Sequence, residues 1–576
     1  MSEQLPGPAQ SPPPPADVIG TIARGTCQDT RHRLYYRDGE EVRSLSLAEF
    51  DAAALRVAAR LHALGVRARD RVGVMAPNRI EWVLLDLAAL KLGAVTAGIE
   101  PNRYEPSAVL AEFGLTLLFT DDAEDAGAPG LGDAGPDSGP VRHIAQVRAW
   151  AFSSSGGPAD PSDMPPHPGY DPADICAIKQ TSGSTGPPKG IEVTVASVNQ
   201  SLAAVQEMFD HRDGDNLLVF LPVRFLQQRY WFYSALVHGH DVTLADRVTA
   251  ETTARAVSPT VVMGVPGFYE QLRARLEADG VPAGPEGRSA AIQQALGGRV
   301  RYLWTGSAPA GRQVLRFFND AGVPLYEGYG LNETCIVSKN HPGAFRLGSV
   351  GQVLPHKRIR FDEDGVLVVG SSAPVNTRYT WCAPGTSEKV FLPTGEVRTY
   401  DVGHVDEDGF LYIDGRVDDI VTLSGALNVL VPLVEERVRE LPGVHDCAVF
   451  GDGRPYLTVV VSPAASPDGR DRTGTDRTGT DRTGGGRRYR EELARGLTKL
   501  NEEFRYEQRV YAAVVAEEPF SIDNGLLNAQ YKLVRGRIGA RYAPDLERVY
   551  GEHRVYNDGT IGSAPVVVRE AEGREQ

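Results

Sequence analysis

One ten-residue stretch has the composition of a phosphate-binding loop. It is TSGSTGPPKG at residues 181–190, and it follows the apolar run 175–178. Its glycines and hydroxyl residues can present backbone N–H groups and hydroxyls to a polyphosphate, and Lys189 adds one ammonium. The spacing is not that of a P-loop, because Gly183 and Gly186 are three apart and no Ser or Thr follows the lysine. An ordinary Gly/Ser turn would have the same composition, so residues elsewhere in the chain must show whether this stretch binds phosphate.

Further segments follow this loop in an order that is typical of one superfamily. They are GRVRYLWTGSAP at 298–309, YEGYGLNET at 326–334, YDVG at 400–403 and GFLYIDGRVDD at 409–419. Together with the loop they resemble the motifs of the adenylate-forming superfamily, which contains acyl-CoA synthetases, firefly-type luciferases and peptide-synthetase adenylation domains. Segments at 259–270, 345–351, 449–457 and 524–532 are similar to the long-chain acyl-CoA synthetase branch.

The resemblance implies a role for each matching residue. Attack of a carboxylate on the α-phosphorus of ATP brings two anions together, so cations and N–H groups must neutralise charge there. Lys532 matches the catalytic lysine, Glu333 matches the acid that holds Mg²⁺, and Lys189 belongs to the phosphate loop. The nucleotide-binding set implied by the resemblance is Thr181, Ser182, Gly183, Ser184, Thr185, Gly186, Gly306, Ser307, Tyr329, Gly330, Asn332, Asp401 and Arg416.

The implied reaction has two halves. A carboxylic acid, fatty or aryl, reacts with ATP to give acyl-AMP and pyrophosphate, and the acyl group then passes to CoA. Between the two half-reactions the C-terminal domain of this family rotates. Asp418 matches the hinge of this rotation. Gly425 matches the loop that is expected to line the tunnel for the thiol. We therefore expect ATP, Mg²⁺ and CoA as cofactors, with Asp401 binding the ribose and Tyr329 facing the adenine.

Several positions depart from the family's pattern. Val195 and Phe225 stand where histidine is common, Asn332 replaces threonine, and Tyr400 replaces the glycine before Asp401. The retained charged residues indicate intact ATP chemistry. The changes fit either drift within the acyl-CoA synthetases or a different acceptor, namely a carrier-protein thiol, an amine, or an aromatic amine diazotised by adenylated nitrite.

A catalytically silent nucleotide-binding or scaffold protein is a further alternative, because a fold does not secure a function. The chain keeps Glu333 and Lys532, which the resemblance places in separate domains. Retention of both catalytic charges argues against a silent protein.

Composition limits the classes of protein that remain. The chain has 576 residues, 41% of them hydrophobic, which is enough for two or more domains with a large core. Its formal net charge of −15 disfavours a nucleic-acid partner. Its five scattered cysteines form no CxxC pair, and no signal sequence or spanning segment is visible. We expect a cytoplasmic enzyme with small-molecule substrates.

The elements that must position these residues alternate between helix and strand. Ser46 and Glu49 form a capping-box pattern before a helix that should end near residue 64. Apolar run 72–75, helical pattern 81–92 and apolar run 94–99 then predict a parallel α/β unit. Further apolar runs at 217–221, 234–236, 260–265 and 301–304 predict more strands of a layered α/β protein with its site at the strand ends.

Composition also divides the chain. Residues 1–16 should be disordered, 17–415 should form a large layered α/β N-terminal adenylation domain, and 416–560 a smaller mobile α+β domain, with the site between them. A flexible insertion is expected at 464–488, where DRTGT repeats have no apolar position. Residues 123–172 read as a surface excursion, and 561–576 as a tail.

Overall fold

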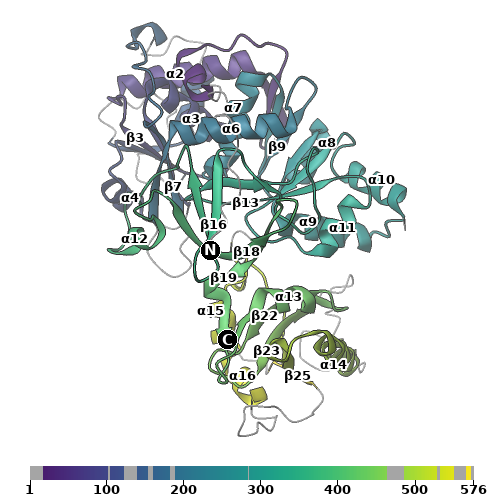
Figure 1. Cartoon of the computed structure of the whole chain (residues 1–576). Coiled ribbons are helices and arrows are strands. Elements are labelled where there is room, and N and C mark those ends of the chain that lie inside the picture. Colours follow the sequence, from purple (N-terminus) through teal and green to yellow (C-terminus); the bar gives the residue numbers. More distant parts are fainter. Residues whose placement is uncertain are drawn as a thin grey trace.

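The chain folds into a larger and a smaller unit. A computed structural model describes residues 17–101, 104–121, 139–152, 160–181, 189–282, 284–463, 485–528, 532–550 and 566–571. In Figure 1 the larger unit runs through β19, and the smaller unit, with α13 to α16, lies below it. The architecture is mixed α/β, as predicted. The predicted division at residues 415 and 416 falls in the last two residues of β19 (Leu411–Arg416) and stays a prediction.

Two mainly parallel sheets form the centre of the larger unit. One has the order β15-β14-β13-β12-β11-β9-β10-β1-β2, and the other the order β6-β5-β3-β4-β7-β8. The strands of the first are β1 (Arg33–Asp38), β2 (Glu41–Ser46), β9 (Asn216–Val219), β10 (Asp241–Leu244), β11 (Val261–Met263), β12 (Tyr302–Thr305), β13 (Leu325–Leu331), β14 (Cys335–Lys339) and β15 (Gln352–Val353). The strands of the second are β3 (Arg71–Met75), β4 (Val95–Gly98), β5 (Leu117–Thr120), β6 (Val141–His143), β7 (Ile175–Thr181) and β8 (Lys189–Thr194).

Helices cover these sheets. Ser46 and Glu49 exchange both capping-box hydrogen bonds at the start of α2, as predicted. Every residue of α3 is buried, because its apolar residues lie on all sides of the helix. The helices are α1 (Val18–Arg24), α2 (Leu47–Ala63), α3 (Ile80–Leu92), α4 (Pro106–Phe113), α5 (Gln146–Phe152), α6 (Val195–Phe209), α7 (Leu226–His238), α8 (Ala250–Val257), α9 (Pro266–Ala278), α10 (Pro285–Ala295), α11 (Arg312–Asn319) and α12 (Thr386–Val390).

Two sequence expectations in this unit are wrong. Residues 234–236 are not a strand but part of α7, whose length and left-handed Gly239 cap mark a helix that a short apolar run does not reveal. Residues 123–172 are not only a surface excursion. Although 122–138 and 153–159 lie outside the described residues, β6 pairs with β5 and α5 packs on α2.

A third layer of β16 (Lys357–Phe361), β17 (Val366–Ser371), β18 (Val397–Val405) and β19 leads to the smaller unit. That unit contains β20 (Ile420–Thr422), β21 (Asn428–Leu430), β22 (Val444–Phe450), β23 (Leu457–Pro463), β24 (Val510–Val515), β25 (Val567–Glu570), α13 (Val431–Arg439), α14 (Gly485–Glu503), α15 (Arg535–Arg541) and α16 (Ala543–Tyr550).

Two predicted boundaries in the smaller unit need correction. The predicted tail, 561–576, contributes β25, which pairs in parallel with β24 and buries Val568. α14 begins at Gly485, inside the stretch expected to be a flexible insertion. The DRTGT repeats and residues 1–16 lie outside the described residues.

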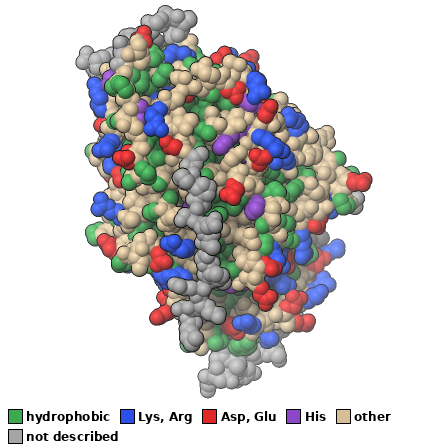
Figure 2. Space-filling view, turned by 45° about the horizontal axis from the view of Figure 1, so that its top comes forward, with side chains coloured by type: hydrophobic (Ala, Val, Ile, Leu, Met, Phe, Trp, Pro, Cys, Tyr) green, Lys and Arg blue, Asp and Glu red, His purple; other side chains and the backbone are tan. Residues whose placement is uncertain are grey.

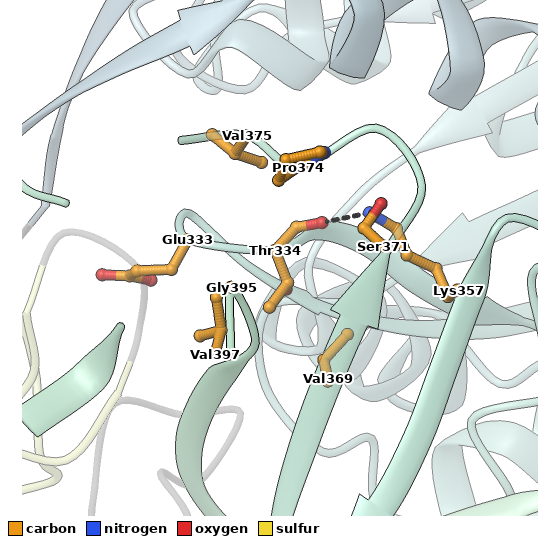
Figure 3. A pocket seen from close by; sticks show the side chains of 9 residues that line it. All are labelled: Glu333, Thr334, Lys357, Val369, Ser371, Pro374, Val375, Gly395 and Val397. Carbon is orange, nitrogen blue, oxygen red and sulfur yellow. Dashed lines mark hydrogen bonds between the residues drawn. The ribbon is translucent and has the colours of Figure 1, made fainter. Parts of the chain in front are cut away.

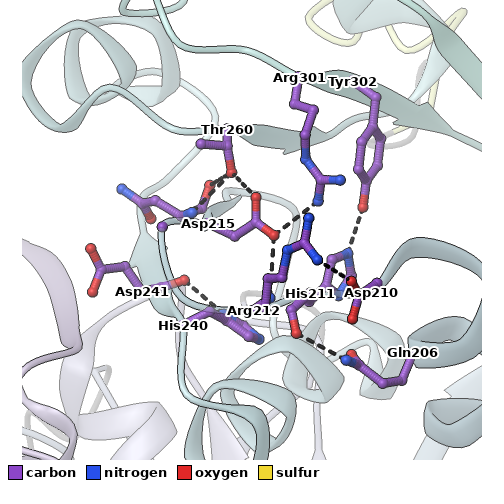
Figure 4. A network of polar contacts seen from close by, with 12 residues as sticks. Gln206, Asp210, His211, Arg212, Asp215, His240, Asp241, Thr260, Arg301 and Tyr302 are labelled. Atoms are coloured by element: carbon purple, nitrogen blue, oxygen red, sulfur yellow. Dashed lines mark hydrogen bonds and ion pairs between the residues drawn. The ribbon is translucent and has the colours of Figure 1, made fainter.

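A polar network holds the strands of the nine-stranded sheet together at their amino ends (Figure 4). Thr260 donates to Asp215 at 2.8 Å, and the Arg301 guanidinium lies 2.9 Å from the other oxygen of that carboxylate. His211 contacts the Tyr302 hydroxyl at 2.5 Å, and burial lowers the pKa of this histidine well below its usual value. These groups precede β9, β11 and β12, so the opposite, carboxyl ends of the strands remain for a site.

The surface carries charges of both signs. On the face drawn in Figure 2, basic and acidic side chains are interspersed rather than gathered in one patch. Among the residues described, no helix combines the length and the apolar character needed to span a membrane.

Candidate active site

The predicted phosphate loop connects two antiparallel strands. β7 ends at Thr181, which is paired with Lys189 at the start of β8. Residues 182–188, with Ser182, Gly183, Ser184, Thr185 and Gly186, lie outside the described residues. After the loop, the Gly190 N–H donates to the Trp381 carbonyl at 3.1 Å, and an added Cβ at Gly190 would lie 2.2 Å from the Trp381 ring. Only glycine therefore fits beside this tryptophan.

Glu333 lies in the turn between β13 and β14 and is joined to the loop by one tyrosine. The Tyr379 hydroxyl donates to Glu333 Oε1 at 2.6 Å, while the Lys189 ammonium lies 5.3 Å from the centre of the Tyr379 ring. Burial, and then the neighbouring Glu333, raise the pKa of Tyr379, so it remains a donor. Sequence reasoning missed Tyr379, since it lies outside every family motif.

A small cavity lies behind this turn (Figure 3). It is lined by Thr334, Lys357, Ser371 and several apolar residues. The Glu333 carboxylate points away from Lys357 and Ser371. The carboxylate is thus turned to the side where Tyr379 and Lys189 lie.

The residues that were predicted to bind the ribose lie in contact with one another. Arg416 donates to Asp401 Oδ1 at 2.8 Å, and the Tyr329 hydroxyl donates to the other carboxylate oxygen. Burial raises the pKa of Asp401, although Arg416 and Tyr329 act in the opposite direction. Tyr400 adopts φ of +63°, the left-handed conformation that favours glycine, so the backbone shape survives the replacement of the family's glycine.

Lys532 is brought to this group from the smaller unit. Its side chain is exposed by surface area, yet enough protein surrounds it for desolvation to lower its pKa. The charge of Arg416 lowers that pKa further, and the charge of Asp401 raises it. The ammonium therefore lies within electrostatic range of Asp401 and Arg416, although both residues are far from Lys532 in the sequence.

The remaining predicted nucleotide residues border the same region. Ser307 adopts φ of +71°, and a Cβ added at Gly306 would lie 3.0 Å from the Gly328 carbonyl. A Cβ at Gly330 would lie 2.0 Å from the Cys335 carbonyl, so the β13–β14 turn requires glycine there. The Asn332 carbonyl accepts from the Lys179 ammonium at 3.4 Å.

Two of the positions that depart from the family pattern, Val195 and Phe225, lie at the starts of helices. Val195 is the first residue of α6 and is buried in the core. Phe225 precedes α7, where the Arg224 guanidinium stacks 4.3 Å from its ring centre. The aromatic run of Tyr230, Trp231, Phe232 and Tyr233 is buried in the main core.

This donor set fits a nucleotide with Mg²⁺. Lys189 and Lys532 could supply positive charge to phosphate groups, and the Asp401 carboxylate could accept hydrogen bonds from ribose hydroxyls. No cluster of three His, Cys, Asp or Glu side chains able to hold a metal occurs among the described residues. Mg²⁺ is usually held by one or two carboxylates together with phosphate oxygens and waters, and Glu333 is a carboxylate that could serve in this way.

Family models match both units of the chain. A model described as AMP-binding enzyme matches residues 23–371, and one described as AMP-binding enzyme C-terminal domain matches 418–554. A long-chain fatty-acid–CoA ligase of Mycobacterium bovis is 27% identical over 85% of this chain and 90% of its own length. An indoleacetate–CoA ligase of Aromatoleum aromaticum is 27% identical over 74% and 84% of the two chains.

Solved structures share the fold. The ATP-bound MatB of Rhodopseudomonas palustris superposes with a TM-score of 0.70 at 21% identity, covering 92% of this chain and 99% of its own. The AMP-bound o-succinylbenzoate–CoA synthetase of Bacillus subtilis gives 0.68 at 20% identity, covering 91% and 98%. The predicted fold class and the predicted class of AMP-forming acid–thiol ligase are confirmed, and ATP, Mg²⁺ and CoA are the cosubstrates of that class. The chain belongs to the AMP-binding enzyme family.

Proposed function

We propose that this protein activates an acid as its adenylate and then transfers the acyl group to a thiol, with CoA as the first candidate. An oxygen of the acid attacks the α-phosphorus of ATP, the bond to the bridging oxygen breaks, and pyrophosphate leaves with that electron pair. In the second half a thiolate attacks the acyl carbon and AMP leaves. The acid ligases among the relatives support this proposal.

Each charged residue has a distinct task in the first half. Asp401, oriented by Arg416 and Tyr329, binds the ribose hydroxyls and so fixes the nucleotide. Lys532 neutralises charge between the attacking oxygen and the α-phosphate. Lys189 faces the phosphates from the loop, and Glu333 would hold the Mg²⁺ that adds positive charge there.

The position of Lys532 is the observation that carries this proposal. Lys532 comes from the smaller unit and lies within electrostatic range of Asp401 and Arg416, which belong to β18 and β19 of the larger unit. This arrangement supports the adenylation half, in which the two units enclose the nucleotide.

Replacing Lys532 tests it. We expect Lys532→Ala to lower the rate of pyrophosphate release about 10²- to 10³-fold, the usual loss for one transition-state donor, with the KM for ATP less affected. Lys499→Ala, an exposed lysine on α14, is the matched control and should leave the rate unchanged. Equal rates for Lys532→Ala and wild type would contradict the assignment.

One panel of assays identifies both the acid that is activated and the acceptor of the acyl group. Pure protein is incubated with ATP, Mg²⁺ and fatty or aryl acids, with and without CoA, and pyrophosphate and product mass are measured. A thioester that requires CoA supports the first candidate. AMP release without CoA and without thioester would instead favour a carrier protein, an amine, or nitrite with an aromatic amine. The absence of ATP cleavage with every acid would favour a silent protein.

A non-CoA acceptor has one structural observation in its favour. Val195, where the family commonly has histidine, is buried in the core and cannot contact an acceptor.

A further inference from the structure

The segment 374–381, between β17 and α12, is attached to β8 at both of its ends. Near one end, the Thr194 N–H donates to the Val375 carbonyl at 3.1 Å. Near the other end, the Thr380 N–H donates to the Gly190 carbonyl at 2.8 Å. The backbone of this segment is therefore fixed relative to the strand that follows the phosphate loop.

Tyr379 belongs to this segment, and its ring is held by its neighbours. Its backbone N–H donates to the Ser387 hydroxyl at 3.0 Å, and its ring packs edge-to-face on Phe391 with 5.1 Å between the ring centres. The residue is only 6% exposed, although the Lys189 ammonium lies 5.3 Å from the ring centre. Because a tyrosine hydroxyl lies on the long axis of its ring, the packing of this ring fixes the position of the hydroxyl.

The turn that carries Glu333 is also fixed, but through its backbone and its neighbours. The Lys357 ammonium donates to the Thr334 carbonyl at 2.9 Å, and the Leu331 N–H donates to the Thr334 hydroxyl at 3.0 Å. Neither contact involves the Glu333 side chain, which is partly exposed and points away from Lys357 (Figure 3). The direction of the Glu333 carboxylate therefore depends on something else.

One hydrogen bond supplies that direction. The Tyr379 hydroxyl donates to Glu333 Oε1 at 2.6 Å. Among the residues that the structure describes, the carboxylate has no second hydrogen bond and no ion pair, so Oε2 stays open to a ligand. A long glutamate side chain loses rotational freedom when it binds a ligand, and a partner that already orients it lowers this cost.

An oriented carboxylate with one open oxygen suits the metal that the site would hold. Mg²⁺ requires near-octahedral geometry and takes one or two carboxylate ligands beside phosphate oxygens and waters. Groups that orient the ligands of a metal commonly change its affinity 10- to 100-fold, according to about that range for their removal. The hydroxyl of Tyr379 is in the place of such a group.

We propose that Tyr379 is a positioning residue, whose hydroxyl holds the Glu333 carboxylate in the orientation that binds the Mg²⁺ of the bound nucleotide. This inference rests on the proposed function and adds to it the group that prepares the metal ligand. The same ring lies beside Lys189, so one side chain sets the spacing between a cation for the phosphates and the carboxylate for the metal.

Nucleotide binding without turnover tests this role. The affinity of the full-length protein for α,β-methylene-ATP, which cannot release pyrophosphate, is measured by calorimetry with saturating Mg²⁺ and again with EDTA. The ratio of the two Kd values gives the gain in affinity due to Mg²⁺. We expect Tyr379→Phe, which keeps the ring, to lower this ratio about 10-fold, while the Kd in EDTA changes little. An unchanged ratio, including an equal loss under both conditions, would mean a structural role only and overturn the inference.

A second tyrosine provides the matched control. The Tyr412 hydroxyl, in β19, donates to Asp406 at 3.1 Å, so Tyr412→Phe removes the same kind of contact elsewhere. We expect it to leave the Mg²⁺-dependent gain at the wild-type value. A loss equal to that of Tyr379→Phe would overturn the inference. Thermal unfolding checks that both variants fold, which we expect because each keeps its ring.

A double-mutant cycle shows whether Tyr379 acts through Glu333. In a Glu333→Ala background the hydroxyl has no carboxylate to hold, so adding Tyr379→Phe should change the Mg²⁺-dependent gain no further. A further loss as large as that in the wild-type background would overturn the inference. Pyrophosphate release by the wild type with the panel of acids tests the proposed function separately. Release together with an unchanged binding ratio in Tyr379→Phe would refute this inference alone.

Discussion

At the scale of single residues, the site depends on close packing that only glycine permits. Gly190 lies beside Lys189, and its backbone is bound to Trp381, whose ring is stacked on Phe113 with 4.8 Å between the ring centres. A methyl group at Gly190 would require this indole to move. The position of Lys189 over Tyr379 therefore depends on a residue that makes no contact with a substrate.

Gly190→Ala should weaken nucleotide handling and stability together. We expect a loss of about 1–3 kcal/mol in the free energy of unfolding, as is usual for overpacking, and a higher KM for ATP. Denaturant unfolding and pyrophosphate-release kinetics measure the two effects. Gly536→Ala in α15 is the control, because an added Cβ there meets nothing within 4 Å and alanine should be neutral or slightly stabilising. Similar losses in both variants would contradict the packing argument.

The sequence predicted the charged residues of the site but not their neighbours. Asp401, Arg416 and Lys532 were found because family motifs mark them, while Tyr379 falls between motifs and resembles any loop tyrosine. Lys179 and Lys339 each come near the end of a strand, after a run of apolar residues, so the sequence does not show whether their side chains are buried. Their burial follows from the layers that cover β7 and β14, which a single sequence does not display.

At the scale of elements, local signals decided which predictions were correct. The capping box at Ser46 and the succession of β3, α3 and β4 are encoded within a few residues, and both were predicted. The short apolar run in α7 was misread as a strand, because helix and strand differ there only in the length of the whole segment. β25 was missed since its pairing with β24 joins segments that are distant in sequence.

One histidine links the segment before β1 to the loop after α6. His32, which precedes β1, contacts Asp29 at 2.5 Å and Asp213, in the loop after α6, at 3.1 Å. Burial by itself lowers the pKa of His32, but its hydrogen bonds with the two carboxylates outweigh this and leave it raised. A raised folded-state pKa means that the stabilisation is complete below the unfolded value of about 6.5 and is lost as pH rises through the folded value.

The predicted pH dependence can be measured by urea unfolding. The stability difference between wild type and His32→Gln should be largest near pH 5.5 and should shrink steadily as the pH is raised to 8.5. His445→Gln, at an exposed position, should show no such trend. A difference that grows with pH would mean that His32 is bound in its neutral form.

At the scale of the whole molecule, one ion pair between the two units is open to solvent. The Arg312 guanidinium of α11 lies 3.7 Å from Glu436 of α13, and both side chains are largely accessible to solvent. Exposed pairs of this kind contribute at most about 1 kcal/mol. A pair this weak would oppose little of the reorientation of the smaller unit that the proposed second half-reaction requires.

The proposed hinge lies where such a rotation would be absorbed. Asp418 is the middle residue of a short 3-10 turn (Val417–Asp419) directly after β19, and its exposed side chain lies 3.8 Å from the Arg416 guanidinium.

Proline at this position fixes one backbone dihedral, so Asp418→Pro should keep pyrophosphate release near the wild-type rate but lower formation of the transferred product at least about 10-fold. Asp418→Ala removes the same side chain and leaves the backbone free, so both half-reactions should persist. Quenched single-turnover assays that start from preformed adenylate measure the transfer step separately from adenylation. Transfer by the proline variant at the wild-type rate would place the rotation elsewhere or show that the second half needs none.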